Sequence, residues 1–264
     1  MAKSDKRKIV VKMGGSTLDA EDVLVQFAES IAVLPEDCEI TVVHGGGKDI
    51  ARQLEKMGRE FTFIDGLRVT DDEIIDVVEM VLSGLVNKWI TRALERRSVR
   101  AVGISGTDLE LFHAEKLCVE GGDLGYVGSI KRVSTELIEI LIEKGITPVV
   151  SPISIGGEGR AYNVNADHAA GKLAEAWKAD DLIYITDVSG ITIDGSIREI
   201  IHIDEVEDLI GSGEITGGMI PKLMNCAAAV SHGVGRVHII GWEGPQSIVN
   251  SIHEDSHMGT IIIK

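Results

Sequence analysis

Two apolar runs that each end in glycines constrain the fold of this 264-residue chain more than any other feature. The first is "KIVVKMGGST", which begins at Lys8, and the second is "EITVVHGGGKD", which begins at Glu39. Each run predicts a buried strand, and the glycines remove side chains where the chain has to turn. A helical pattern follows each turn, so the sequence predicts parallel strands that are connected by helices.

The same alternation of strand-like and helical patterns continues along almost the whole chain. It predicts an α/β fold in which helices cover both faces of a mainly parallel sheet. We expect Asp19 to cap the first helix and a capping box that starts at Thr70 to begin a later one. The positions expected to face the core include Ile50, Leu54 and Met57 in one helix, and Ile74, Val77, Val81 and Leu85 in the next.

Two changes of pattern set the expected domain organisation. Short alternating runs with glycine breaks at 114–133 predict antiparallel hairpins inside the α/β pattern. A new apolar strand, "DLIYIT", starts shortly after residue 178. We therefore expect two lobes, an N-terminal lobe at 1–178 and a C-terminal lobe at 179–264.

Composition excludes several functional classes. The formal net charge of −16 argues against a surface that binds nucleic acid or anionic lipid. No apolar run reaches the roughly 20 residues that a membrane-spanning helix needs. The cysteines, Cys38, Cys118 and Cys226, have no metal-ligand spacing, and we expect them to be reduced and buried as small core side chains. We expect a cytoplasmic protein with no nucleic acid and no membrane partner.

The two glycine turns are candidate anion sites. Open parallel sheets bind ligands beyond the carboxyl ends of their strands, where both turns are expected, and free backbone N–H groups there favour anions. Neither turn reads GxGxxG and no GxxxxGK[ST] is present, which argues against Rossmann and P-loop sites. A single glycine turn is more often structural. Lys12 favours the binding interpretation, because an ammonium in an apolar strand needs an anionic partner, although a solvated strand end is the alternative.

Further polar groups lie at other predicted turns. Arg68, in "FIDGLRVTDDE", is placed to clamp a carboxylate, with a surface arginine as the alternative. Asn163, Asn165 and Asp167 alternate at a strand-to-helix junction, where they either point at one ligand or cap the helix. Lys222 lies in the first turn of a predicted helix and opposes its dipole, which favours anion binding over a role in stability.

Two lysines, glycine turns and one aspartate suit phosphoryl transfer, in which catalysis consists mostly of positioning and charge neutralisation. The set "KMGG", "VHGGGK", "DGLRVTD", "YNVNAD", "TDVSGI" and "TGGMIPK" resembles the amino acid kinase family along the whole chain. The specific part, "GLRVTD" with "NVNAD", is most similar to the members that phosphorylate N-acetyl-L-glutamate. The resemblance implies a three-layer α/β/α sandwich, with an N-terminal lobe for the acyl amino acid and dimerisation and a C-terminal lobe for ATP.

The resemblance also implies roles in catalysis. Lys12 and Lys222 would stabilise the transferring phosphoryl group, and Asp167 would hold both lysines in place. The cofactor implied is ATP with Mg²⁺, with no metal ligands from protein side chains. Backbone N–H groups for the phosphoryl group and the substrate would come from Gly14, Gly15, Gly45 and Gly46.

The implied substrate contacts lie at separate motifs. Arg68 would bind the α-carboxylate of the substrate and Asn163 its α-substituent. Asp187, Ser189 and Gly190, in "TDVSGI", would contact the nucleotide, although an ordinary turn explains the first two almost as well.

The activity implied is transfer of a phosphoryl group from ATP to the γ-carboxylate of N-acetyl-L-glutamate, giving N-acetyl-L-glutamyl 5-phosphate in arginine synthesis. A carboxylate is already a nucleophile at neutral pH, so no general base is needed. The alternatives are a kinase of the same fold for another acidic or carrier-bound amino acid, and a non-catalytic nucleotide sensor. Few residues precede the first predicted strand, so we expect a homodimer without the arginine feedback of hexameric members.

Overall fold

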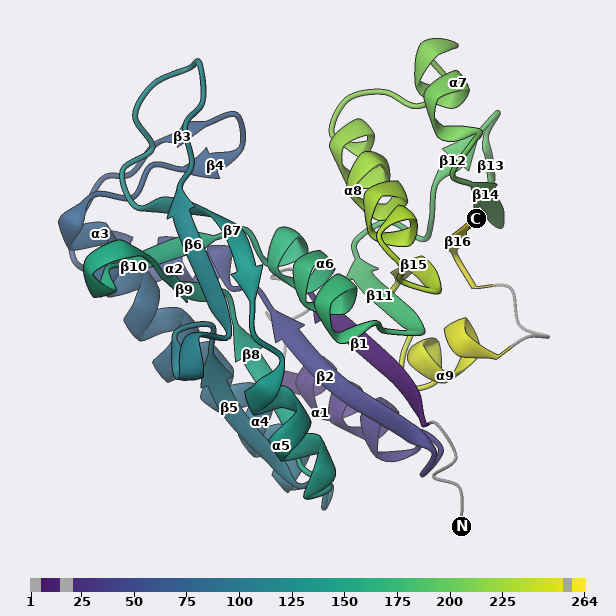
Figure 1. The fold of residues 1–264 in the computed structure, drawn as a ribbon, viewed down its shortest axis with the longest axis horizontal. Coiled ribbons are helices and arrows are strands. Elements are labelled where there is room, and N and C mark those ends of the chain that lie inside the picture. Colours follow the sequence, from purple (N-terminus) through teal and green to yellow (C-terminus); the bar gives the residue numbers. More distant parts are fainter. Residues whose placement is uncertain (1–5, 15–20, 254–257) are drawn as a thin grey trace.

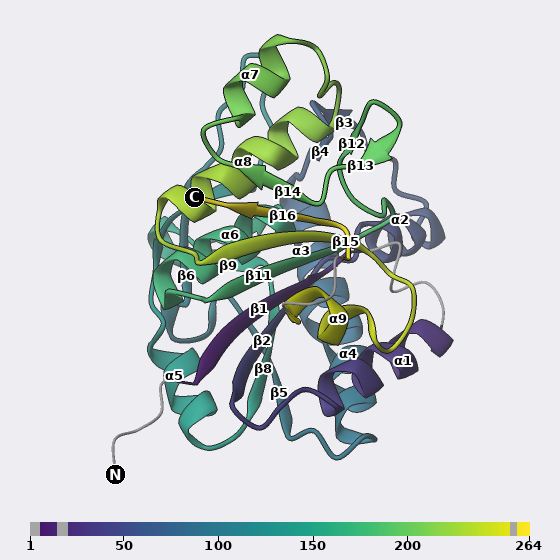
Figure 2. The ribbon, with the colours of Figure 1, turned by 90° about the vertical axis from the view of Figure 1, so that its right-hand side faces the viewer.

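The protein, seen in a computed structural model that describes residues 6–14, 21–253 and 258–264, is built around one large sheet. Within these residues the sheet has eight strands in the order β14-β16-β15-β11-β1-β2-β8-β5 (Figure 2). The strands are β1 (Arg7–Met13), β2 (Cys38–His44), β5 (Ala101–Ser105), β8 (Thr147–Ser151), β11 (Asp181–Thr186), β14 (Ile200–His202), β15 (Arg236–Gly241) and β16 (Thr260–Ile263).

Neighbouring strands of this sheet are parallel, except that β15 and β16 are antiparallel. In the register of the central pair, Lys12 of β1 lies opposite Tyr184 of β11 and Val43 of β2. The carboxyl ends of β1, β2 and β11 therefore meet at one edge of the sheet, which brings both glycine turns there. The mainly parallel sheet predicted from the sequence is confirmed.

Helices cover both faces of the sheet and form a three-layer sandwich, as predicted (Figure 2). One core cluster lies under the first helical layer, and a second cluster lies under the other. The first layer contains α1 (Glu21–Ala32), α2 (Gly47–Lys56), α3 (Asp72–Glu79), η2 (Met80–Val86), α4 (Asn87–Glu95) and α9 (Ser247–Ile252). The other contains α5 (Glu136–Glu143), α6 (Ala166–Trp177), α7 (Val206–Gly211) and α8 (Met219–Ser231).

A small closed barrel interrupts the α/β pattern. It consists of β6 (Phe112–Lys116), β7 (Val127–Val133), β9 (Ile153–Ile155) and β10 (Ala161–Val164). β6 and β7 are antiparallel, which confirms the hairpin expected at 114–133. The helix α6 follows β10 directly and lies between β7 and α8 (Figure 1). Short elements complete the chain: β3 (Phe63–Ile64), β4 (Leu67–Arg68), η3 (Asp108–Glu110), η4 (Gly157–Gly159), β12 (Thr192–Ile193) and β13 (Ser196–Ile197).

The helix expected from Thr70 onward differs from the prediction in two ways. Its N-cap is Asp71, whose carboxylate accepts hydrogen bonds from the N–H groups of Glu73 and Ile74. After α3 the chain continues as the π-helix η2, which buries Leu82 and Val86 and leaves Leu85 half-buried. A π-helical turn needs more residues than an α-helical turn, so the apolar stripe shifts and an extrapolated 3.6-residue period fails there.

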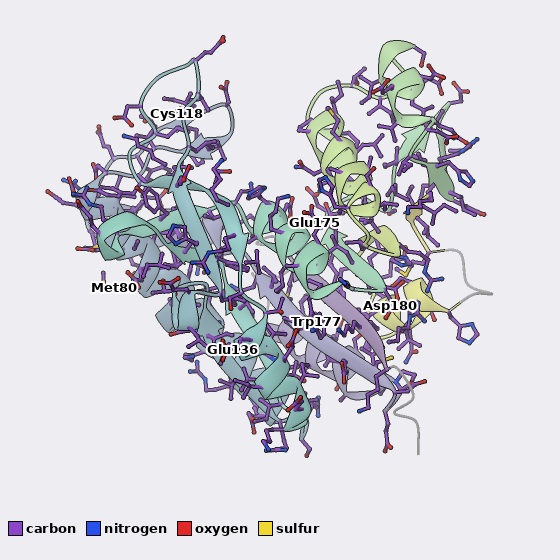
Figure 3. The ribbon with its side chains drawn as sticks, viewed as in Figure 1. Met80, Cys118, Glu136, Glu175, Trp177 and Asp180 are labelled. Atoms are coloured by element: carbon purple, nitrogen blue, oxygen red, sulfur yellow. The ribbon has the colours of Figure 1, made fainter. Side chains whose placement is uncertain are left out.

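Three other predicted core positions are wrong. Met57 is 59% exposed because α2 ends at Lys56, so Met57 has left the apolar stripe. Cys118 is exposed, because it lies in the loop after β6 (Figure 3), and Cys38 is only partly buried at the start of β2. Cys226 is buried as expected. The predicted cap Asp19 lies outside the described residues. No helix in the described part of the chain is long and apolar enough to cross a membrane.

Candidate active site at the carboxyl edge of the sheet

Lys12 and Asp167 form a close ion pair at the carboxyl edge of the sheet. Lys12 Nζ lies 2.6 Å from Asp167 Oδ1, and the two side chains are 13% and 29% exposed. Lys12 points away from the α1 layer because its neighbours in β1, Val11 and Met13, face that layer. Asp167 comes from the first turn of α6, on the opposite layer. The ammonium predicted to need an anionic partner therefore has one within the protein.

Lys222 reaches the same edge from α8. Its Nζ donates a hydrogen bond to Thr186 Oγ1 (3.2 Å) at the end of β11, and Thr186 Oγ1 donates to Asp187 Oδ1 (2.9 Å). The pKa of Asp187 is lowered, first by this hydroxyl and further by the positive charges of Lys222 and Lys12. Lys222 lines the same cavity as Asp167, the partner of Lys12, so β1, α6 and α8 bring these three side chains to one edge of the sheet.

Two cavities lie next to each other along this edge. One, of about 350 Å³, is lined by Asp167 and Lys222 together with residues of β7 and α8. The other, of about 220 Å³, is lined by the second glycine turn with Arg68 and Asn163. Three residues line both cavities: Leu67, Val127 and Asn165. The charged end and the glycine end of the site are therefore adjacent.

Arg68 is buried with one side of its guanidinium unsatisfied. Its Nη2 donates to Gly47 O (3.0 Å), and the guanidinium lies over the rings of Phe61 (4.2 Å) and Phe63 (4.8 Å). Burial lowers its pKa. Nη1 is buried and has no hydrogen-bond partner among the described residues. A ligand carboxylate in the smaller cavity would satisfy this donor, so the arrangement suits the predicted carboxylate clamp.

The polar residues of "YNVNAD" divide between the two interpretations of that motif. Asn165 is the N-cap of α6 and accepts hydrogen bonds from the N–H groups of Asp167 and His168. Asn163 lines the smaller cavity, and its Nδ2 donates to Thr70 Oγ1 (3.2 Å). Asn165 therefore caps the helix and also lines both cavities, whereas Asn163 and Asp167 line one cavity each.

The glycines let the backbone and charged groups approach closely. A Cβ on Gly14 would lie 3.3 Å from Ile185 O and 3.4 Å from Lys12 Nζ, so the lysine head lies over Gly14. Gly45 N–H donates to Met13 O (3.1 Å), which ties the second glycine turn to the end of β1. A Cβ on Gly46 would lie 2.7 Å from a methyl group of Leu82. Gly15 lies outside the described residues.

His44, on the buried side of the second glycine turn, supports that turn through a contact with Gly45. It is fully buried; its Nδ1 lies 2.8 Å from Gly45 O and its Nε2 lies 3.2 Å from Asn87 Nδ2. Burial lowers the pKa of His44 to about 4, so the ring is neutral at neutral pH. Nδ1 then donates to the carbonyl of Gly45, and Nε2 accepts from Asn87. In a trans peptide the N–H points away from the C=O, so the N–H of Gly46 points away from His44.

The residues of "TDVSGI" lie at the carboxyl end of β11, as predicted. Asp187 and Ser189 are exposed, and Gly190 is buried. At Gly190 φ is 158°, and a Cβ would lie 3.0 Å from Thr260 Oγ1, so close packing explains this glycine. Within the described residues, no group of three or more His, Cys, Asp or Glu side chains is arranged to hold a metal ion.

Four contributors to the site were not singled out from the sequence. Thr186 holds Lys222, Phe61 and Phe63 stack on Arg68, and Asn87 supports His44. Thr186 directly precedes Asp187, so its place at a strand end was the available signal. Phe63 pairs with Arg68 in the local β3–β4 hairpin, and Phe61 lies just before that hairpin, so closeness in sequence was a weak signal for both. Asn87 comes from α4 and reaches His44 only through tertiary folding.

Comparison with known proteins decides the family. A model of the amino acid kinase family matches residues 7–241. The chain belongs to the amino acid kinase family. The most similar relatives include the acetylglutamate kinase of Caldanaerobacter subterraneus subsp. tengcongensis, which is 43% identical over an alignment of 263 residues that covers 98% of this chain and 88% of that protein. The acetylglutamate kinase of Methanococcus maripaludis is 40% identical over 277 residues, with 100% of this chain and 94% of that protein covered.

A solved structure extends the comparison to the fold of this family. The carbamate kinase of Giardia superposes with a TM-score of 0.73 at 16% identity, over 99% of this chain and 100% of that chain. At this identity the likeness concerns the fold alone. It agrees with the three-layer arrangement described above.

Proposed function

We propose that this chain transfers the γ-phosphoryl group of ATP to the γ-carboxylate of N-acetyl-L-glutamate, giving N-acetyl-L-glutamyl 5-phosphate for arginine synthesis. One observation carries the proposal: the Lys12–Asp167 ion pair and Lys222 lie at one sheet edge, beside a cavity that contains Arg68. The names of the relatives in the amino acid kinase family support this acceptor.

The smaller cavity is proposed to hold the acyl amino acid. The unsatisfied Nη1 of Arg68 would donate to its α-carboxylate, and Asn163 would contact the α-substituent. The γ-carboxylate would then point toward Lys12 and Asp167. Because an ionised carboxylate is already nucleophilic, this site needs to position two anions and to neutralise charge, and it needs no base.

Charge neutralisation is proposed to come from both lysines. Lys12 and Lys222 would contact the oxygens of the transferring phosphoryl group, and Asp167 would keep the ammonium of Lys12 in place. From the glycine turns we propose the N–H groups of Gly14, Gly15 and Gly46 as further donors. Gly45 N–H already donates a hydrogen bond to Met13 O, so it is not free to bind the ligand. Gly45 would instead contribute by shaping the turn that presents Gly46.

The C-terminal lobe, residues 179–264, is proposed to bind ATP. Asp187, Ser189 and Gly190 would contact the nucleotide at the end of β11. Mg²⁺ would arrive on the ATP phosphates and reduce their charge, as is usual for an ion held mainly by phosphate and water.

The N-terminal lobe, residues 1–178, is proposed to form a homodimer in the cytoplasm. Light scattering of the purified protein tests the assembly. A mass of two chains is expected, and a monomer or a ring of six would contradict this part of the proposal.

The acceptor is tested by an assay of ADP release with N-acetyl-L-glutamate, L-glutamate, L-aspartate and UMP side by side. N-acetyl-L-glutamate should give the highest kcat/KM. No rate on N-acetyl-L-glutamate, together with a clear rate on another acceptor, would contradict the assignment and favour a different kinase of this family.

A variant of Lys222 separates a kinase from a nucleotide sensor. Lys222→Ala should lower kcat by about 100-fold, the effect of removing one preorganised donor, with a much smaller change in ATP affinity. Lys56→Ala is the matched control, since Lys56 is exposed on α2 away from both cavities. A loss of ATP affinity with unchanged turnover would favour the sensor.

A further inference from the structure

Thr70 connects the two side chains that are proposed to bind the acyl amino acid. It is fully buried, and its hydroxyl donates a hydrogen bond to Arg68 O (2.8 Å). The same Oγ1 accepts a hydrogen bond from Asn163 Nδ2 (3.2 Å). Thr70 is not itself a lining residue of the cavity that contains Arg68 and Asn163. It therefore acts on the ligand only through these two neighbours.

The hydrogen bonds of Thr70 determine which way the amide of Asn163 points. A hydroxyl has one hydrogen, and the carbonyl of Arg68 can only accept, so the hydrogen of Thr70 is committed to Arg68. Oγ1 can then only accept from Asn163, which requires the NH₂ end of Asn163 to face Thr70. The reverse orientation would place two acceptors, Oδ1 and Oγ1, against each other. The orientation follows from hydrogen-bond chemistry and not from the amide assignment alone.

The backbone of Thr70 is held firmly enough to make this orientation persistent. Its N–H donates to Leu124 O (3.0 Å), and its carbonyl accepts from Tyr126 N–H (2.7 Å). Gly125 packs directly against that carbonyl, since a Cβ there would lie 2.1 Å from Thr70 O. The backbone N–H of Asn163 donates to Tyr126 O (2.8 Å), so Asn163 and Thr70 are fixed to the same short segment.

We propose that Thr70 is a positioning residue that sets substrate specificity by turning the Oδ1 of Asn163, a hydrogen-bond acceptor, toward the ligand. No described residue donates a hydrogen bond to this oxygen. The site then selects a donor beside the α-carbon of the acceptor substrate, such as the amide N–H of an N-acylated amino acid. It disfavours a ligand that has an acceptor at that position. The inference rests on the proposed function and deepens it.

The test compares two acceptors that differ at one atom. N-acetyl-L-glutamate carries an amide N–H, and the ester isostere 2-acetoxyglutarate has an oxygen acceptor in its place. The wild type should prefer the amide by at least about 10-fold in kcat/KM, because the ester would oppose two acceptors. Binding of both compounds is measured by calorimetry alongside turnover.

Thr70→Val and Thr70→Ser form the matched pair of variants. Val keeps the shape and loses the hydroxyl, so the amide of Asn163 becomes free to rotate and the amide-to-ester ratio should narrow by about 10-fold. Ser keeps the hydroxyl and should retain the wild-type ratio. KM for ATP should stay unchanged in both variants. Thr70→Ala is measured as well, with the same expectation as Val, in case the isosteric variant does not fold.

The outcomes separate this inference from the proposed function. An unchanged amide-to-ester ratio in folded Thr70→Val or Thr70→Ala, or an equal loss in Thr70→Ser, would overturn the role of Thr70. If wild-type protein neither binds nor phosphorylates N-acetyl-L-glutamate, the proposed function itself is contradicted. A merely structural role of Thr70 would lower stability or turnover on both acceptors and leave their ratio unchanged.

Discussion

Lys12 Nζ and Asp167 Oδ1 lie 2.6 Å apart, although Lys12 is the second-last residue of β1 and Asp167 lies in the first turn of α6. Asp167 is held from its own backbone: Asn165 accepts its N–H, and the hydroxyl of Tyr184 donates to its carbonyl (3.0 Å). The carboxylate is therefore positioned before any ligand arrives. Preorganised charge of this kind is what phosphoryl transfer requires.

Asp167→Asn tests the ion pair. The substitution leaves a mostly buried ammonium without its counter-charge, so Lys12 should lose its fixed position and kcat should fall by about 100-fold. KM for ATP should change far less. Steady-state kinetics with both substrates varied give the two effects separately.

The control for that prediction is another ion pair on the same helix. Lys172 Nζ lies 2.7 Å from Glu175 Oε2 on α6, outside the residues that line either cavity. Glu175→Gln should leave kcat within about 2-fold of wild type, since partly exposed pairs contribute little. Equal losses in the two variants would mean that the Lys12–Asp167 pair has no special role.

Gly46→Ala tests the close packing of the second glycine turn. A Cβ there would meet Leu82 at 2.7 Å and Val86 at 3.2 Å, so the variant should lose about 1–3 kcal/mol of unfolding free energy by overpacking. Gly47→Ala is the control, because no atom lies within 4 Å of a Cβ at that position. Urea denaturation of the three proteins measures the difference. A Gly46→Ala variant as stable as Gly47→Ala would contradict the packing described here.

His44 should make stability depend on pH below 6.5. Its folded pKa of about 4 is depressed by burial, so between pH 6.5 and 4 the unfolded chain binds a proton that the folded chain does not. The free energy of unfolding should therefore fall as the pH drops through this window, by about 3 kcal/mol from His44 alone. Above pH 6.5, His44 should cause no pH dependence of stability. NMR titration of the His44 ring measures the pKa directly. A midpoint near 6.5 in the folded protein would contradict the buried, neutral ring.

Charged residues at unfavourable local positions were sufficient to find the main charged groups of the site. Lys12 interrupts an apolar strand, and Lys222 opposes a helix dipole, so both stand out against local physical expectations. Arg68 and Asn163 were found in the same way, from polar side chains at predicted turns. The two-layer covering of the sheet followed from the alternation of strands and helices.

The supporting contacts were beyond the reach of sequence reasoning. Phe61 and Phe63 look like ordinary apolar residues, and only the folded chain shows both rings against the Arg68 guanidinium and against each other. No feature of the local sequence predicted the π-helix η2 either, yet this helix places Leu82 and Val86 against Gly46. The antiparallel pairing of β15 with β16 likewise depends on how the C-terminal segment crosses the sheet.

The most direct test of the central claim is a crystal structure of the protein with ADP, Mg²⁺, aluminium fluoride and N-acetyl-L-glutamate, in which the fluoride complex mimics the transferring phosphoryl group. The account predicts that the Nζ atoms of Lys12 and Lys222 both lie within about 3 Å of the fluoride ligands. Asp167 should still contact Lys12 in that complex. A structure in which either lysine faces solvent or a different cavity, with the fluoride complex bound elsewhere, would contradict it.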